Sequence, residues 1–179
     1  MKRIAIGVAV AIVILLGVIA TRPDHYRVER AITVATDAKI PYAIVSDHHN
    51  GAKWSPWEHL DPAMKKEYFG VVSGQGAGYH WAGNKDAGEG NMTITEAVAP
   101  SHLGMRLEFI KPFAGVCSTS YDFTPVAGGT SITWRMEGKN DFMGKAVSLF
   151  CNMDTMIGKD FEKGLASLKT LVEKPGSAG

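Results

Sequence analysis

Apolar and polar residues alternate along several short segments of the chain. A period of two predicts β-strands with one buried and one exposed face, as in an antiparallel sheet covered on a single side. Turn-forming residues separate the later segments at hairpin spacing. The sequence therefore predicts six to seven strands, which we place at residues 26–34, 66–73, 77–83, 90–96, 103–109, 117–123 and 131–137.

The period changes near Asn140, where apolar residues begin to recur at steps of three and four. This pattern predicts one amphipathic helix over Asn140–Lys174. Each glycine inside it weakens the helix by about 1 kcal/mol relative to alanine, so we expect a bend or a close approach to the sheet at these positions. They are Gly144, Gly158 and Gly164.

Two short helical segments are predicted after the first strand, one ending near Ser46 and one within His48–Asp61. Strands followed by a single long helix are typical of a sheet wrapped around that helix. We therefore predict an α+β fold, in which a curved antiparallel sheet of six to seven strands surrounds a C-terminal helix and encloses a cavity.

The N-terminal segment differs in composition from the rest of the chain. Lys2 and Arg3 precede an uncharged run, Ile4–Ala20, of 17 residues. This length is at the short limit for spanning a bilayer and exceeds most signal-peptide cores. An uncleaved anchor is the favoured interpretation because the run is unbroken, and a signal cleaved after Ala20 is the alternative. The two basic residues favour a cytoplasmic N-terminus, with the domain on the periplasmic or extracellular side. Cleavage would give a secreted or periplasmic protein instead.

The remaining chain is long enough for one domain with a sizeable core. We divide the protein into residues 1–22 as anchor or signal, 23–174 as one folded domain, and 175–179 as a disordered tail. Proteins that bind nucleic acid usually have an excess of positive charge, whereas the net charge of this chain is only +1. We therefore exclude nucleic acid as a partner. Cys117 and Cys151 could pair or act as two small apolar core residues, and no further cysteines give a metal-type spacing.

Several local motifs resemble one protein family over about Tyr26–Glu173. They are residues 54–57 (WSPW), 76–84 (GAGYHWAGN), 88–94 (GEGNMTI), 129–134 (GTSITW) and 158–165 (GKDFEKGL). Together they are similar to the SRPBCC (polyketide cyclase/dehydrase-like) branch of the START/Bet v 1-like superfamily, with a membrane segment added at the N-terminus. The resemblance implies a helix-grip fold with an apolar cavity between sheet and helix. Members bind lipids, sterols, hormones or polyketides and a minority catalyse, so it implies no single reaction.

The candidate binding residues are large or soft side chains predicted on the concave face. A concave, mostly apolar pocket suits a small hydrophobic ligand. Tyr79 and Trp81 share a strand face opposite His80, and we predict that the first two point inward. Trp57 forms either a lip over the cavity or a membrane contact. The full set is Trp57, Tyr79, Trp81, Met105, Phe109, Thr119, Tyr121, Trp134, Phe142, Phe150, Met153 and Ile157.

The sequence contains no nucleophile–base arrangement, phosphate loop or zinc signature, so we predict neither a cofactor nor a metal. His48, His49, His59 and Asp61 lie close together, but their spacing does not fit a helix-borne metal site, and a solvated loop is predicted. Asp154 either flanks the cavity or acts as a helix cap, a surface charge or a salt-bridge partner, and the second group of roles is favoured.

Three functions fit these observations. The favoured one is binding or carriage of a small hydrophobic molecule, lipid or polyketide-like, by a membrane-anchored domain. The second is a cyclase- or dehydratase-type enzyme in which Tyr79, His80 or Tyr121 transfers a proton. The third is a protein-interaction module whose core is filled.

Overall fold

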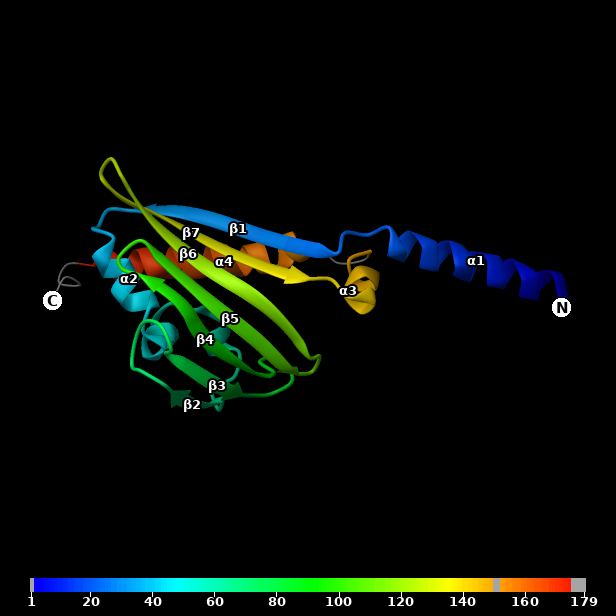
Figure 1. The fold of residues 1–179 in the computed structure, drawn as a ribbon, viewed down its shortest axis with the longest axis horizontal. Coiled ribbons are helices and arrows are strands. Elements are labelled where there is room, and N and C mark those ends of the chain that lie inside the picture. The colour runs from blue at the N-terminus through cyan, green and yellow to red at the C-terminus, as the bar shows by residue number, and fades with distance from the viewer. Residues whose placement is uncertain (1, 150–151, 175–179) are drawn as a thin grey trace.

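The computed structural model describes residues 2–149 and 152–174. In this part of the chain, seven antiparallel strands form one sheet in the order β1-β7-β6-β5-β4-β3-β2 (Figure 1). The strands are β1 (His25–Val34), β2 (Lys65–Phe69), β3 (Gly78–Ala82), β4 (Glu89–Val98), β5 (His102–Lys111), β6 (Gly115–Val126) and β7 (Gly129–Lys139). The predicted antiparallel sheet is confirmed.

The alternation that predicted the strands is also the burial pattern of the sheet. Along β7, Ile132, Trp134 and Met136 are buried, while the residues between them are more exposed. β1 pairs with β7, with Val28 opposite Met136, so the first strand of the sheet lies beside the last. Each strand therefore contributes one apolar face to a shared core.

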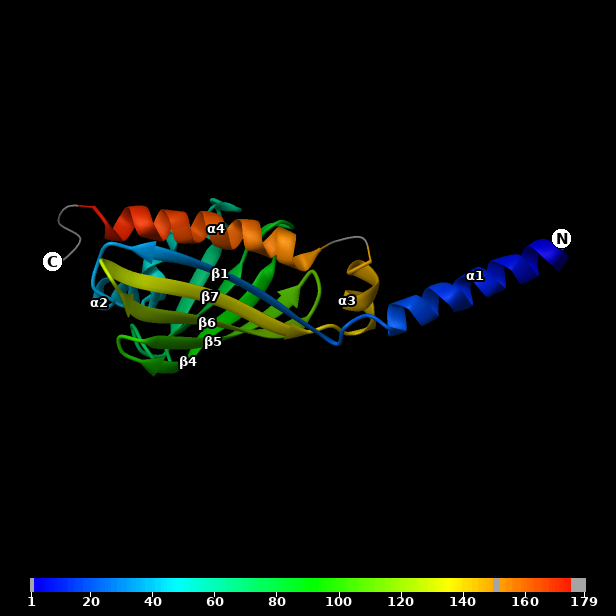
Figure 2. The ribbon, with the colours of Figure 1, turned by 90° about the horizontal axis from the view of Figure 1, so that it is seen from above.

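The described residues also form four α-helices and two 3-10 helices. They are α1 (Lys2–Ala20), α2 (Lys39–Val45), the 3-10 helices η1 (His48–Lys53) and η2 (Pro56–His59), α3 (Phe142–Val147) and α4 (Met153–Val172). Figure 2 shows α4 running along one face of the sheet. Phe161, Leu165 and Leu168 of α4 are fully buried there. The expected α+β, helix-grip arrangement is confirmed.

The prediction of one continuous helix over Asn140–Lys174 was wrong, because a second N-cap lies inside the segment and divides it. Asp141 accepts a hydrogen bond from the Gly144 amide at 2.7 Å and begins α3. Asn152 accepts one from the Thr155 amide at 3.3 Å and begins α4. A capping residue has an extended backbone, which cannot occur inside a helix.

The second strand is shorter than predicted. It ends at Phe69 instead of continuing to Ser73, because glycines with positive φ turn the chain after it. Gly70 has φ 77° and Gly76 has φ 90°. Residues other than glycine rarely adopt such backbone angles.

Two glycines of α4 let the helix approach the sheet closely, as expected. A Cβ at Gly164 would lie 2.9 Å from the Trp134 ring. At Gly158 it would meet Arg30, the charged residue that interrupts the apolar face of β1. Arg30 donates to Asp154 at 2.9 Å and to Glu162 at 2.8 Å. Arg30 thus links β1 to the first turns of α4, which confirms the salt-bridge alternative for Asp154.

Helix α1 extends away from the sheet (Figures 1 and 2). Its side chains are exposed on all sides over most of its length. After it, Arg22 donates to the Ser148 carbonyl at 2.9 Å, next to α3. Within the described residues, no helix reaches the length and hydropathy required of a membrane span.

Candidate functional site

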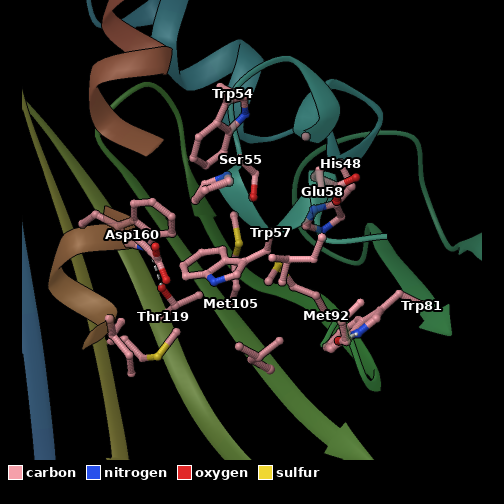
Figure 3. Close-up of a pocket in the computed structure, with 18 of the residues that line it drawn as sticks. His48, Trp54, Ser55, Trp57, Glu58, Trp81, Met92, Met105, Thr119 and Asp160 are labelled. Atoms are coloured by element: carbon pink, nitrogen blue, oxygen red, sulfur yellow. Dashed lines mark hydrogen bonds between the residues drawn. The ribbon is translucent and has the colours of Figure 1, made fainter. Parts of the chain in front are cut away.

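A partly open cavity of about 580 Å³ lies between the concave face of the sheet, the start of α4, and the segment of η1 and η2 (Figure 3). Its wall contains ten of the twelve candidate residues. They are Trp57, Tyr79, Trp81, Met105, Phe109, Thr119, Tyr121, Trp134, Met153 and Ile157. Side chains from four strands, η2 and α4 therefore converge on one space.

The other two candidates do not contribute to the described wall. Phe142 is 54% exposed on α3, and its prediction as a cavity residue was wrong because the helix break turns α3 away from the sheet. Phe150 lies outside the described residues. Cys117 is buried in the core, whereas Cys151 also lies outside the described residues, so their pairing stays a prediction.

Packed aromatic rings form one side of the cavity. Trp134 stacks on Phe161 with ring centroids 4.0 Å apart, and Trp57 meets the Trp134 ring edge-on at 5.3 Å. Trp134 Nε1 donates to Thr119 Oγ1 at 2.9 Å, and Thr119 in turn donates to the Arg135 carbonyl. The polar atoms of Trp134 and Thr119 are thus paired within the protein, and the ring of Trp134 adds apolar surface to the wall.

β3 places its side chains as the alternation predicted. Tyr79 and Trp81 line the cavity, and Trp81 Nε1 donates to the Ala87 carbonyl at 3.1 Å. His80 is absent from the described cavity wall, and its Nδ1 is 2.9 Å from Asn91 Oδ1 on β4. His80 is therefore not placed to act on a molecule in the cavity.

The two tyrosines considered for proton transfer are kept neutral. Burial, together with the neighbouring Tyr68, raises the pKa of Tyr79, and burial raises the pKa of Tyr121 well above its usual value. Both phenols are therefore protonated at neutral pH. They can donate a hydrogen bond to a ligand, but they are poorly suited to remove a proton from one.

His48 was predicted in a solvated loop, but the structure places it in the cavity wall. His48 begins η1 after its N-cap Asp47, and its ring packs against Tyr79 of β3 with ring centroids 5.0 Å apart. Nε2 of His48 is buried and has no hydrogen-bond partner. Burial lowers the pKa of His48 to about 4, so the ring is neutral at physiological pH. Among the described residues, no group of three or more His, Cys, Asp or Glu side chains is arranged to hold a metal.

The wall also contains residues outside the predicted set. Some are apolar residues of the strand alternation, whose period already indicated the inward face; they are Met92, Leu107 and Met136. The charged ones are Asp47, Glu58, Asp86, Asp160 and Lys163. Glu58 Oε2 accepts no hydrogen bond of ordinary geometry, but its carboxylate forms an ion pair with Lys66. Lys163 forms an ion pair with Asp160, in which Nζ lies 3.2 Å from Oδ1. No signal in the sequence indicated which charged residues would lie here.

Comparison with known families identifies the fold described above. The sequence profile of the family described as "polyketide cyclase / dehydrase and lipid transport" matches residues 25–173. The chain belongs to this family. The match covers every strand of the sheet and α4. The family's description joins two activities, so membership supports an apolar ligand without selecting one reaction.

Solved structures share the fold at low sequence identity. Protein CV1439 from Chromobacterium violaceum is 16% identical with a TM-score of 0.59, and the match covers 86% of this chain and 100% of that one. Protein Ms6760 from Mycobacterium smegmatis is 18% identical with a TM-score of 0.56, over 81% of this chain and 89% of that one. The di-domain ARO/CYC BexL of the BE-7585A biosynthetic pathway is 12% identical with a TM-score of 0.64, over 89% of this chain and 54% of that one. No curated protein matched the sequence.

Proposed function

We propose that this family member binds, and carries or passes on, a small hydrophobic molecule, lipid or polyketide-like, in the cavity between the sheet and α4. The observation on which this rests is the cavity itself, whose 580 Å³ lies within the range of small-molecule sites. Trp81, Tyr121 and Met153 line it together, which argues against a filled core. Methionines add flexible apolar surface that can adapt to ligands of irregular shape. They are Met64, Met92, Met105, Met136 and Met153.

Native mass spectrometry of the gently purified full-length chain, followed by solvent extraction, tests this function. We expect one apolar molecule per chain. Met105→Trp adds bulk to the cavity wall and should abolish this occupancy, whereas Met156→Trp makes the same change at a position that is 55% exposed on α4 and should retain it. A wild-type chain that is free of ligand and takes up none from a membrane extract would refute the proposal.

We further propose that α1 holds the domain at a membrane, with the N-terminus cytoplasmic and the domain on the periplasmic or extracellular side. The support is the chemistry of α1. Ile4 is 72% exposed and Val13 is 68% exposed, and apolar side chains surround the helix. A helix that is apolar all round needs apolar surroundings, and this one is isolated from the protein core. Its residues would extend about 28 Å, close to the thickness of the hydrocarbon layer.

The end of the sheet nearest α1 also has exposed apolar side chains. His25 is paired with Lys139 and Cys117 with Gly138, so the β5–β6 connection lies at the end where the chain enters from α1. At this end Phe113 is 79% exposed and Val116 is 52% exposed. A membrane beside this end would cover apolar side chains that otherwise face water.

Cell fractionation tests the role of α1. The full-length chain should remain with membranes after a carbonate wash, and a chain lacking residues 2–20 should move to the soluble fraction. A soluble full-length chain would refute membrane attachment by α1. A mature N-terminus at Thr21, measured by mass spectrometry, would instead support the cleaved-signal alternative.

A further inference from the structure

Within the described residues, two buried polar atoms of the cavity wall have neither a hydrogen-bond partner nor an ion-pair partner. They are Nε2 of His48 and Nε1 of Trp54, at the start and just after the end of η1. Both residues line the cavity, and both atoms are buried. Buried polar groups in folded proteins are nearly always hydrogen-bonded, because an unpaired one costs free energy. Unpaired polar atoms on a cavity wall therefore indicate which hydrogen-bonding groups a bound molecule should have.

The free nitrogen of His48 can act as donor or acceptor. The neutral ring carries a proton on only one nitrogen, and the Ala77 backbone raises the pKa of His48, as a carbonyl that accepts from Nδ1 would. In a neutral imidazole with the proton on Nδ1, Nε2 is an acceptor. The indole Nε1 of Trp54 can only donate. The wall thus offers one acceptor and one donor, and a hydroxyl group needs both kinds of partner.

The charges on the wall disfavour an anionic ligand. Four carboxylates line the cavity, those of Asp47, Glu58, Asp86 and Asp160, against one lysine, Lys163, which is already in contact with Asp160. The Glu58 carboxylate is paired with Lys66. A fatty-acid carboxylate would meet like charges here, and it has no proton to donate to His48 Nε2.

From these contacts we infer that the cavity selects neutral apolar molecules that bear a hydroxyl group, and that His48 Nε2 accepts the hydrogen bond of that hydroxyl. This inference rests on the proposed binding function and names the ligand class of the same site. Figure 3 shows His48 and Glu58 in the segment that covers the cavity, above the apolar wall of the sheet. The hydroxyl would thus lie under η1 and η2, and the apolar body of the ligand along the strands.

All four tryptophans of the chain line the cavity, which provides a built-in reporter. A bromine atom quenches tryptophan on contact, so brominated probes that enter the cavity can be followed by fluorescence. The probes are ω-bromododecanol, bromododecane and ω-bromododecanoate, titrated at about pH 8 into the full-length chain in micelles of a neutral detergent. Comparing variants with the same probe cancels the partitioning of that probe into the micelles.

His48→Phe keeps the ring beside Tyr79 and removes the acceptor. We expect this variant to weaken ω-bromododecanol binding by about three- to tenfold, the loss of one hydrogen bond, and to leave the Kd of bromododecane and ω-bromododecanoate within about twofold. His49→Phe is the matched control, because His49 lies outside the wall and stacks on Tyr68. The His49→Phe variant should leave the Kd of all three probes unchanged. His48→Gln, which retains an acceptor, should restore part of the alcohol binding.

A second comparison uses the wild-type chain alone and does not depend on a variant that folds. After correction for micelle partitioning, ω-bromododecanol should bind more tightly than its methyl ether, which lacks the donor. Equal binding of alcohol and ether, or equal losses for alcohol and alkane in His48→Phe, would overturn this inference and leave the proposed function intact. If no probe quenches the wild-type tryptophans beyond free tryptophan in the same micelles, the proposed function fails, and this inference fails with it.

Discussion

Replacing Phe161 with alanine is expected to lower the free energy of unfolding by about 3 to 5 kcal/mol, the usual cost of truncating a buried phenylalanine. Phe161 is fully buried and stacks on Trp134, with its ring planes 5° apart. It also meets Trp57 edge-on at 6.0 Å. One side chain therefore joins α4 to the sheet and to η2. The surrounding rings are rigid and cannot collapse into the space that the substitution leaves.

The control for this prediction is Met156→Ala, a truncation on the same helix at an exposed position. A surface substitution of this kind should change stability by no more than about 0.5 kcal/mol. Both variants can be measured in the full-length chain by urea unfolding followed by tryptophan fluorescence. If Phe161→Ala costs no more than Met156→Ala, the Trp134–Phe161 stack does not hold α4 on the sheet.

The strands could be predicted well because their period is a direct consequence of burial on one face. Ile132, Trp134 and Met136 alternate in the sequence and are buried in the structure, and Tyr79 and Trp81 face the cavity as their spacing required. Arg30 interrupts that pattern on β1. The reason lies in Asp154 and Glu162, more than a hundred residues later in the chain, which contact Arg30. Periodicity indicates faces, but it does not identify partners across the chain.

The break between α3 and α4 shows a limit of helical periodicity. The apolar spacing continues across the break, so it favoured a single helix and placed Phe142 in the cavity. Asn152 ends this continuity by capping α4, and an asparagine within a helical pattern gives only a weak signal. Asp141 stands where the apolar spacing begins, so its cap agrees with the predicted start of the helix. Asn152 does not interrupt the apolar spacing, which is why this spacing led to the wrong position of Phe142.

The polar part of the cavity could not be predicted for a different reason. The sequence placed His48 in a polar loop, and neighbouring residues there, such as His49, are indeed exposed. What buries the His48 ring is its contact with Tyr79 on β3, with ring centroids 5.0 Å apart. A tertiary contact made by a loop residue produces no periodic pattern in the sequence. The aromatic wall was therefore predictable from local pattern, whereas the hydrogen-bonding chemistry of the site was not.

Lowering the pH from about 7.5 to about 4.5 is expected to cost the wild-type chain about 2 to 3 kcal/mol of stability through His48 alone. The folded state lowers the pKa of His48 from 6.5 to about 4, mainly through burial, while the charge of Asp47 and the Ala77 hydrogen bond oppose this. Between these two values the unfolded chain binds a proton that the folded chain does not. Stability due to the neutral His48 is thus fully present above pH 6.5 and is lost as the pH falls through 4.

The His48→Phe variant tests this contribution, because it removes the titrating group; among the described carboxyl groups with lowered pKa values, only Asp47 interacts with the charge of His48. Asp24, Glu29, Glu89 and Asp154, which have lowered pKa values in the folded chain, also destabilise it in acid, but they do so equally in both proteins. The difference in unfolding free energy between variant and wild type should therefore shift in favour of the variant by about 2 to 3 kcal/mol between the two pH values. Urea unfolding at each pH measures it. If the difference in unfolding free energy between variant and wild type does not change with pH, His48 is solvated in the folded protein. Its Nε2 would then be hydrogen-bonded to water, and a ligand would not be needed to pair it.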